Sequence, residues 1–286
     1  TEPSPLTEGT LGWLRVRVDR ETRILGGEAG GEPLFFRPAV DSSVQALVGV
    51  PVEVGDSFRI SIYRQRGDST DTLVTVLPVR QGGYPNEVLA VSPKFVKPDS
   101  AAVARIQAEI ALSREVSRRS LERGRIWRGR FKLPRSSRIT SRFGAARVFN
   151  GEVQSRHLGT DFAGAIGAPV VAAGAGVVAL VADFYLAGRA IYIDHGAGLV
   201  TAYFHLSRAY VRKGQRVATG QRIGAVGQSG RVTGPHLHWV ARYGGISVDP
   251  MSLIPLDQLE NHVPELELAP AITQPERHTG SGMPLP

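Results

Sequence analysis

After Pro134 the chain alternates short runs of Val, Ala and Ile with glycines, and a helical repeat of apolar residues is nearly absent. Short apolar runs between glycines are typical of strands joined by turns. This stretch therefore predicts a compact antiparallel β architecture with loops over its rim. The strands expected there are residues 169–180, 190–194, 199–205, 223–226 and 236–243.

Residues 11–96 show a second series of short alternating runs, with glycine pairs such as Gly26-Gly27 and Gly82-Gly83 as turn signals. The pattern predicts a small all-β domain of the sandwich type. The region contains no histidine, and we expect it to have a structural or binding role. The strands expected there are residues 11–18, 43–54, 57–63, 72–79 and 86–91.

Between these regions the composition becomes helical, from Asp99 or Ser100, either of which can cap the first free amides, to Gly124. Apolar residues at helical spacing predict a face that packs on one of the two β regions, and arginines occupy the remaining positions. The apolar residues of this expected face are Val103, Ile106, Ile110, Leu112, Val116 and Leu121.

The sequence therefore predicts a mainly β chain in four parts. Residues 1–98 form an N-terminal all-β accessory domain, and 99–134 form an arginine-rich helix and linker. Residues 135–263 form the β domain that carries the chemistry, and 264–286 form a flexible tail rich in Pro and Gly.

Positive charge is concentrated in the centre of the chain, where residues 100–142 carry 12 basic and 3 acidic side chains. Such a stripe is either the solvated face of a helix or a surface for an anionic polymer or lipid of the cell envelope. No aromatic platform or nucleic-acid-binding motif accompanies the arginines, so we expect no nucleic acid partner. No run of about 18 apolar residues is present to cross a membrane.

Because the chain has no cysteine, any metal must be held by histidine and carboxylate side chains. Asp161 follows His157 by four residues, and the intervening Gly159 favours a turn entering a strand over a helix. His236 and His238 are two residues apart in a strand, so both imidazoles face one groove while Leu237 faces the core. Neutral imidazoles on one face are the arrangement that a metal ion stabilises.

The remaining histidines differ in context. His205 ends the run from Thr201, and strict alternation places it on the face of Thr201 and Tyr203, with Phe204 and Leu206 inside. His195 precedes a glycine, and we expect it to stabilise a turn by a hydrogen bond. His262 and His278 receive no role.

Three runs in order, HLGTD, AYFHLS and GPHLHW, resemble the lysostaphin-type, or LytM-like, zinc endopeptidases that cut peptide bridges in bacterial peptidoglycan. The resemblance covers about residues 136–256 and includes the flanking runs SRFGAARVFNG and IGAPVVAAGAGVVALV. It implies that His157, Asp161 and His238 bind zinc and that His205 and His236 are unligated catalytic imidazoles. It also implies an extracytoplasmic location, in the periplasm or cell envelope, with any signal peptide or membrane anchor absent from this chain.

Three protein ligands leave a fourth tetrahedral position for water, as a catalytic zinc site requires. Because no HExxH helix supplies a glutamate, His236 is the preferred general base and His205 the group that stabilises the oxyanion, although the roles can be exchanged or shared. The competing hypothesis is a non-catalytic module of the same fold that binds or activates another cell-wall hydrolase. A third hypothesis is that the accessory domain or the helix covers the groove. The bond cleaved, a D-amino acid cross-link or a glycine bridge, is open from the sequence.

Overall fold

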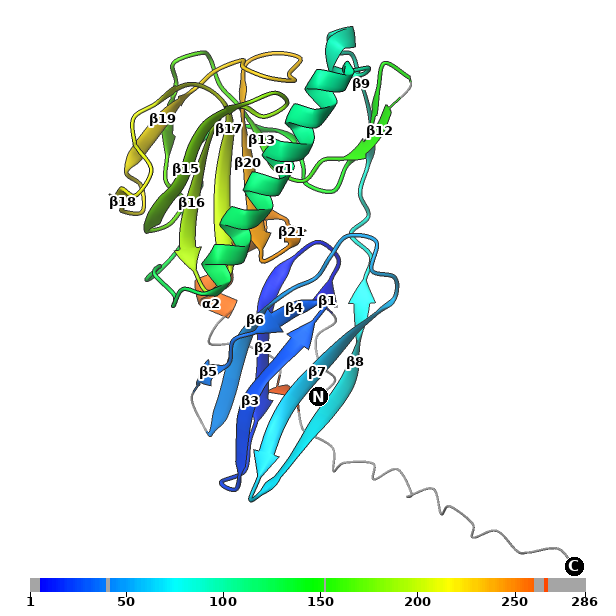
Figure 1. Cartoon of the computed structure of the whole chain (residues 1–286), viewed down its shortest axis with the longest axis vertical. Coiled ribbons are helices and arrows are strands. Elements are labelled where there is room, and N and C mark those ends of the chain that lie inside the picture. The colour runs from blue at the N-terminus through cyan, green and yellow to red at the C-terminus, as the bar shows by residue number, and fades with distance from the viewer. Residues whose placement is uncertain (1–5, 40–41, 152, 260–264, 267–286) are drawn as a thin grey trace, which may run out of the picture.

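The structure is a computed structural model that describes residues 6–39, 42–151, 153–259 and 265–266. Strands are its main secondary structure, arranged as two sheet systems with one long helix lying across the C-terminal one (Figure 1). The prediction of a mainly β fold is therefore confirmed.

The N-terminal part is a sandwich of two sheets whose inner faces share one core. One sheet has the order β1-β8-β7-β3-β4 and the other β22-β2-β6-β5. Val16 and Val48 from one sheet pack with Ile60 and Ile62 from the other. In each strand every second side chain points to the inner face, where these residues meet. The strands are β1 (Leu6–Thr7), β2 (Leu11–Arg17), β3 (Thr22–Ala29), β4 (Glu32–Leu34), β5 (Arg37–Pro38), β6 (Ser43–Gly49), β7 (Ser57–Arg66), β8 (Ser69–Arg80) and β22 (Glu265–Leu266).

The C-terminal part is built on a ten-stranded sheet in which every pairing is antiparallel. Its main path runs β10-β13-β20-β17-β16-β15-β18, with β14, β19 and β21 attached beside it. The strands are β10 (Ile139–Ser141), β13 (Thr160–Ala163), β14 (Pro169–Val171), β15 (Gly176–Phe184), β16 (Gly188–Gly196), β17 (Leu199–Ala209), β18 (Arg216–Val217), β19 (Arg222–Val226), β20 (His236–Tyr243) and β21 (Ile246–Val248).

A small third sheet joins a strand that precedes the long helix to two strands that follow it. Its central strand β11 (Ala146–Phe149) pairs antiparallel with β12 (Val153–Arg156) and parallel with β9 (Asn86–Leu89). The expected strand at 86–91 is thus present, but it pairs with β11 and not with a strand of the sandwich. A segment that precedes the long helix therefore forms part of the C-terminal half.

The long helix α1 (Ser100–Leu121) begins at the cap residue Asp99, whose side chain accepts a hydrogen bond from the amide of Ala102. It lies on the sheet face formed by β15, β16 and β17 (Figure 1). Shorter helical elements are the 3₁₀ turns Pro93–Phe95 and Pro250–Leu253 and the single turn α2 (Leu256–Leu259).

The expected apolar face of α1 is wrong for three of its six residues. Val103, Ile110 and Leu112 are exposed, and the buried positions are Ala102, Ser113, Val116, Ser117 and Ser120. Small side chains allow the helix to approach the sheet closely, and their hydroxyls find partners: Ser113 Oγ lies 2.9 Å from the Tyr192 hydroxyl, and Ser120 Oγ donates to Asp194 Oδ1 at 2.6 Å.

The largest core spans both halves of the molecule. Trp13 and Leu47 of the sandwich pack with Tyr243 and Leu256 of the C-terminal half in one buried cluster, and Trp13 Nε1 donates to the carbonyl oxygen of Leu256 at 3.0 Å. The division of the chain into domains at 98, 134 and 263 remains a prediction. The expected flexible tail lies outside the described residues except for Glu265–Leu266, which pairs as β22 with β2.

None of the helices that the structure describes combines the length and the hydropathy needed to span a bilayer.

Candidate metal centre

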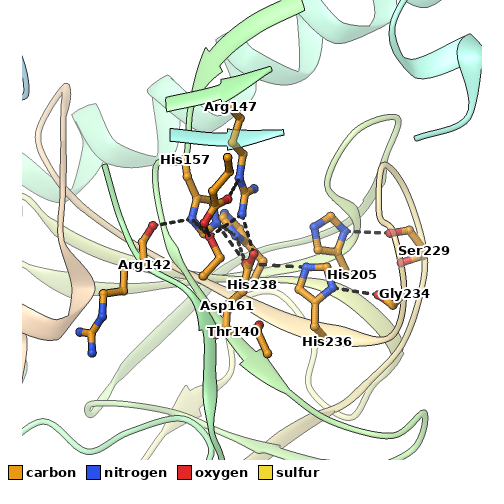
Figure 2. Close-up of polar contacts among 12 residues, drawn as sticks. Thr140, Arg142, Arg147, His157, Asp161, His205, Ser229, Gly234, His236 and His238 are labelled. Carbon is orange, nitrogen blue, oxygen red and sulfur yellow. Dashed lines mark hydrogen bonds and ion pairs between the residues drawn. The ribbon is translucent and has the colours of Figure 1, made fainter. Parts of the chain in front are cut away.

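Antiparallel pairing places Asp161 and His238 side by side. Asp161 on β13 stands directly opposite His238 on β20, so their side chains share one face of the sheet. His157 lies in the turn that leads into β13, held there by backbone hydrogen bonds to Ala145 and Gly144. The sequence expectation of a turn before a strand is confirmed, and the three side chains converge (Figure 2).

The donor atoms of these residues meet at one point. His157 Nε2 lies 3.1 Å from Asp161 Oδ1 and 3.0 Å from His238 Nδ1, and the latter two atoms are 2.7 Å apart. Donor atoms around a tetrahedral zinc ion with bonds of about 2 Å are about 3.3 Å apart, so a small expansion of this triangle fits the ion. Two nitrogens and one carboxylate oxygen are also the donor types that zinc selects.

Electrostatics favours the ligating protonation states. Burial lowers the pKa of His238 to about 4, although Asp161 opposes this shift, so the ring is neutral near pH 7. Burial alone raises the pKa of the Asp161 carboxyl, but the hydrogen-bonding imidazoles of His238 and His157 hold it well below its usual range. An ionised carboxylate beside a neutral imidazole is what metal binding requires.

Gly159 makes this close approach possible. A Cβ atom at residue 159 would lie 2.6 Å from the His238 ring and 2.7 Å from the carbonyl oxygen of Trp239. Any side chain there would displace β20, because real Cβ atoms do not approach other atoms so closely.

Two further imidazoles, of His205 and His236, lie beside the triangle (Figure 2). Their ring centroids are 4.9 Å apart, and His236 Nε2 is 3.7 Å from Asp161 Oδ1. His205 Nδ1 donates to the carbonyl oxygen of Ser229 at 2.8 Å and His236 Nδ1 to that of Gly234 at 2.9 Å. A carbonyl accepts only, so both rings carry hydrogen on Nδ1 and leave Nε2 as an acceptor. Burial, followed by the neighbouring His238 and His236, holds the pKa of His205 well below its ordinary value.

His205 reaches this place against the expected alternation. Thr201 and Tyr203 are fully buried, Leu206 lies in the same core cluster as Tyr203, and Phe204 stacks on the His238 ring at 5.4 Å. The prediction that His205 shares a face with Tyr203 is therefore wrong. His205 has a left-handed backbone with φ of 60°, which interrupts the two-residue period and allows its ring to lie beside His236.

An ion-pair network that sequence reasoning missed surrounds two of the candidate ligands. Arg147 on β11 donates from Nη2 to Asp161 Oδ2 and to Ser141 Oγ, each at 2.8 Å, and from Nε to Glu87 Oε2 at 2.9 Å. Ser141 Oγ donates to Glu87 Oε1 at 2.7 Å and lies 3.0 Å from His157 Nδ1. His157 Nδ1 also donates to the carbonyl oxygen of Arg142 at 2.7 Å.

In this network the two oxygens of the Asp161 carboxylate have different partners. Oδ1 faces the imidazoles, and Oδ2 is held by Arg147. Arg147 stands in a run that resembles the family pattern, but Glu87 stands outside the resembling stretch, so no motif could have indicated it.

The five predicted residues border one open groove of about 550 Å³. Its walls come from β9 and β11, from the residues before β13, from the turn at Leu186 and Ala187, and from the loop 231–235 before β20. The groove is open to solvent, as binding sites generally are.

His195 is a structural residue. It is fully buried, its Nδ1 donates to the carbonyl oxygen of Ala175 at 2.8 Å, and its Nε2 accepts from the Thr201 hydroxyl at 2.8 Å. These bonds join β16 to its neighbours, whereas the sequence led us to expect a turn contact. Burial lowers its pKa to about 4. His262 and His278 lie outside the described residues.

Sequence comparison adds relatives to this geometry. The chain is 42% identical over 149 residues to the peptidoglycan DD-endopeptidase ShyA of Vibrio cholerae serotype O1. The matched stretch covers 51% of this chain and 34% of ShyA. It is 33% identical over 232 residues to the DD-endopeptidase ShyB of the same organism, covering 80% of this chain and 53% of ShyB. The chain thus spans about half or less of the length of these curated relatives.

A solved structure is also similar to this chain. The crystal structure of a Pseudomonas aeruginosa protein described as a peptidase M23 superposes with a TM-score of 0.67 at 25% sequence identity, covering 88% of this chain and 95% of that one. The profile of Peptidase family M23 matches residues 155–250, the stretch that holds all five histidine and aspartate residues of the groove. These residues of the chain therefore form a domain of peptidase family M23.

Proposed function

We propose that this chain is a zinc-dependent endopeptidase that hydrolyses peptide bonds in bacterial peptidoglycan, in stem peptides or cross-bridges. The observation that carries the proposal is the meeting of His157, Asp161 and His238, whose donor atoms all lie within 4.8 Å of one another. The two spare imidazoles and the open groove beside them support it.

In this proposal His157 binds the ion through Nε2, Asp161 through Oδ1 and His238 through Nδ1, the atoms that face one another. When bound, zinc supplies Lewis-acid polarisation of the scissile carbonyl and lowers the pKa of a water molecule to about 7. The carbonyl of Arg142 fixes the tautomer of His157, because it forces hydrogen onto Nδ1 and leaves Nε2 free.

His236 and His205 move the proton. Each has Nε2 free to accept one, because its Nδ1 hydrogen is engaged by a backbone carbonyl. The ring that takes the proton from the attacking water becomes a donor at Nε2, able to stabilise the oxyanion or to protonate the leaving amine. We assign the base role to His236, whose Nε2 lies 3.7 Å from Asp161 Oδ1, and oxyanion stabilisation to His205.

The substrate class is taken from the relatives, ShyA and ShyB being named peptidoglycan DD-endopeptidases. Because peptidoglycan lies outside the cytoplasmic membrane, the proposed activity places the protein in the periplasm or cell envelope.

Hydrolysis of purified sacculi, followed by mass spectrometry of the released muropeptides, tests the proposal and identifies the bond. We expect about one zinc ion per chain by elemental analysis, loss of hydrolysis on chelation, and recovery on adding zinc. Replacing His238 with Ala should lower the rate more than about 100-fold, since loss of a ligand removes several kcal/mol of transition-state stabilisation. Undiminished, chelator-resistant hydrolysis by this variant would contradict the proposal.

The competing hypothesis is a non-catalytic module that binds or activates another hydrolase, and it predicts no hydrolysis by this chain. Metal-free protein would then still bind its partner, and sacculi would stay intact at every zinc concentration.

A further inference from the structure

The groove is lined by more cations than anions. Four arginines line it, Arg138, Arg147, Arg156 and Arg231, against two carboxylates, those of Glu87 and Asp161. Both carboxylates are already bound by Arg147. The other arginines of the lining therefore differ in how their charge is balanced.

Arg156 is balanced from outside the groove, since its guanidinium donates to Glu53 Oε1 at 2.6 and 2.9 Å. Arg138 is exposed and its charge is solvated. Arg231 is half-buried, and among the residues that the structure describes no carboxylate forms an ion pair with it.

The structure fixes Arg231 in place. Its backbone amide donates to the carbonyl oxygen of Leu186 at 2.8 Å, and its guanidinium carbon lies 4.3 Å from the centre of the Phe149 ring. Phe149 is two residues beyond Arg147 on β11, so both side chains face the groove. A guanidinium over an aromatic ring can still direct its N–H groups, which lie in the guanidinium plane, to a planar acceptor.

Arg231 also lies in the loop that positions the two catalytic imidazoles. The carbonyl of Ser229, two residues before it, binds His205, and that of Gly234, three residues after it, binds His236. Arg231 and both imidazoles line the same groove, so a group held by Arg231 lies in the groove that contains the proposed reaction site. Burial and the nearby charge of Arg147 lower the pKa of Arg231, which shows that its surroundings favour an added negative charge.

We infer that Arg231, stacked on Phe149 in the groove, binds a free carboxylate of the substrate peptide close to the cleaved bond. The inference rests on the proposed endopeptidase function and adds a substrate class to it: peptides with a side-chain or terminal carboxylate beside the scissile bond, preferred over the amidated forms. Arg suits this task because its fork makes two parallel hydrogen bonds to a carboxylate.

The test uses two synthetic peptides that differ only in one carboxylate, which is a carboxamide in the second peptide. They are given to the full, zinc-loaded wild-type chain and to the variants R231M, R231K and R222M. R222M is the matched control, because Arg222 also stacks on an aromatic ring, Tyr210 at 4.6 Å, but does not line the groove.

We expect wild type to prefer the carboxylate peptide by about 10- to 100-fold in kcat/KM, the size of a charge-assisted contact. R231M should lose that preference by slowing on the carboxylate peptide alone, R231K should retain part of it, and R222M should retain all of it. Zinc content and melting temperature should be the same in all four proteins.

Equal cleavage of both peptides by wild type would overturn the inference while leaving the endopeptidase intact, as would an equal loss on both peptides in R231M. If wild type cleaves neither peptide, the proposed function fails, and the role of Arg231 is then tested by measuring peptide binding. Fluorescence anisotropy of the labelled peptides should then still show tighter binding of the carboxylate form by wild type than by R231M, and equal affinities would refute the assignment.

Discussion

The most informative residue is His205, because its backbone departs from the rule that the sequence suggests. Tyr203 is buried in the core and Phe204 stacks on His238 beside the groove, the reverse of the expected sides. The left-handed φ at 205 then interrupts the alternation, so that His205 also lies beside the groove. Residues other than glycine adopt the left-handed backbone conformation only where the surrounding structure holds them in it, often at functional sites. The type and spacing of the five groove residues could be predicted from sequence, whereas this one backbone angle could not.

Glu87 carries the clearest prediction for the metal centre. Replacing it with Gln leaves Asp161 as the only carboxylate that compensates the charge of Arg147, so more positive charge opposes the ion and zinc affinity should fall by about 10- to 100-fold. Competition with a chromophoric chelator measures this without any substrate. The cobalt-substituted protein should also change its visible absorption spectrum, which reports ligand geometry.

Glu53→Gln is the matched control, since Glu53 pairs with Arg156 at an exposed position away from the ligands. Wild-type affinity in the Glu87 variant, or an equal loss in the control, would argue against a positioning role.

His195 predicts how stability depends on pH. Its pKa is about 4 in the folded chain and about 6.5 when unfolded, so between these values the unfolded chain binds a proton that the folded chain excludes. The contribution is complete above pH 6.5 and is lost as pH falls, by about 2 kcal/mol at pH 5.

His238 and His205 shift in the same direction, so the comparison must be with a variant and not with absolute stability. Urea unfolding of wild type and His195→Gln at pH 7 and pH 5 should show a smaller drop in the variant. A drop of the same size would mean that another group is responsible.

At the scale of elements, helix α1 shows how a correct helix prediction can carry the wrong contact face. Its start at Asp99 and its length follow from capping and composition, but three of the six expected apolar residues are exposed. The contact is made by small residues whose hydroxyls bond to Tyr192 and Asp194, partners that are distant in sequence. A periodicity of hydrophobic residues cannot report a face of this kind.

Two substitutions on α1 distinguish these faces. Ser120→Ala removes the donor to the buried Asp194 carboxylate and should lower the free energy of unfolding by about 1–3 kcal/mol. Leu112→Ala, at a side chain that is 43% exposed, should change it by less than about 0.5 kcal/mol. Chemical denaturation of both variants checks the order, and a larger effect at Leu112 would restore the apolar face.

At the scale of the whole molecule, the two β regions were recognisable from sequence but their connections were not. The runs of alternation marked most strands, yet nothing in 86–91 indicated a parallel partner in 146–149. Likewise Trp13 gave no sign that it packs against Leu256, which is 243 residues away. Such long-range contacts depend on chain topology, which local patterns do not encode.

Truncation tests what these connections do. A chain of residues 130–263 lacks β9 and α1, so Arg147 and Ser141 lose Glu87 and the cluster beneath the helix is exposed. We expect it to bind zinc more weakly and to unfold at a lower temperature than the full chain. A chain of residues 84–263 keeps both elements and should retain zinc affinity.

Calorimetry measures the unfolding temperature of both fragments, and competition with a chelator measures their zinc affinity. The rates of sacculus hydrolysis, measured with zinc in excess, test whether the sandwich or the helix covers the groove. Equal rates for the full chain and the 84–263 fragment would rule out the sandwich, and a fragment 130–263 as stable and as tightly zinc-bound as the full chain would show that β9 is dispensable.

The pairing of β9 with β11 also limits how far the two halves of the molecule can move apart. Four residue pairs tie this strand to the groove wall, so a swing that carried β9 away would strip Glu87 from Arg147. The short segment between β8 and β9 is also held in place, because the Gly82 amide donates to Glu8 Oε2 at 3.0 Å and the Tyr84 hydroxyl to the carbonyl oxygen of Glu8 at 2.6 Å. Together with the core that Trp13 and Leu47 share with Tyr243 and Leu256, these contacts hold the sandwich firmly against the C-terminal half.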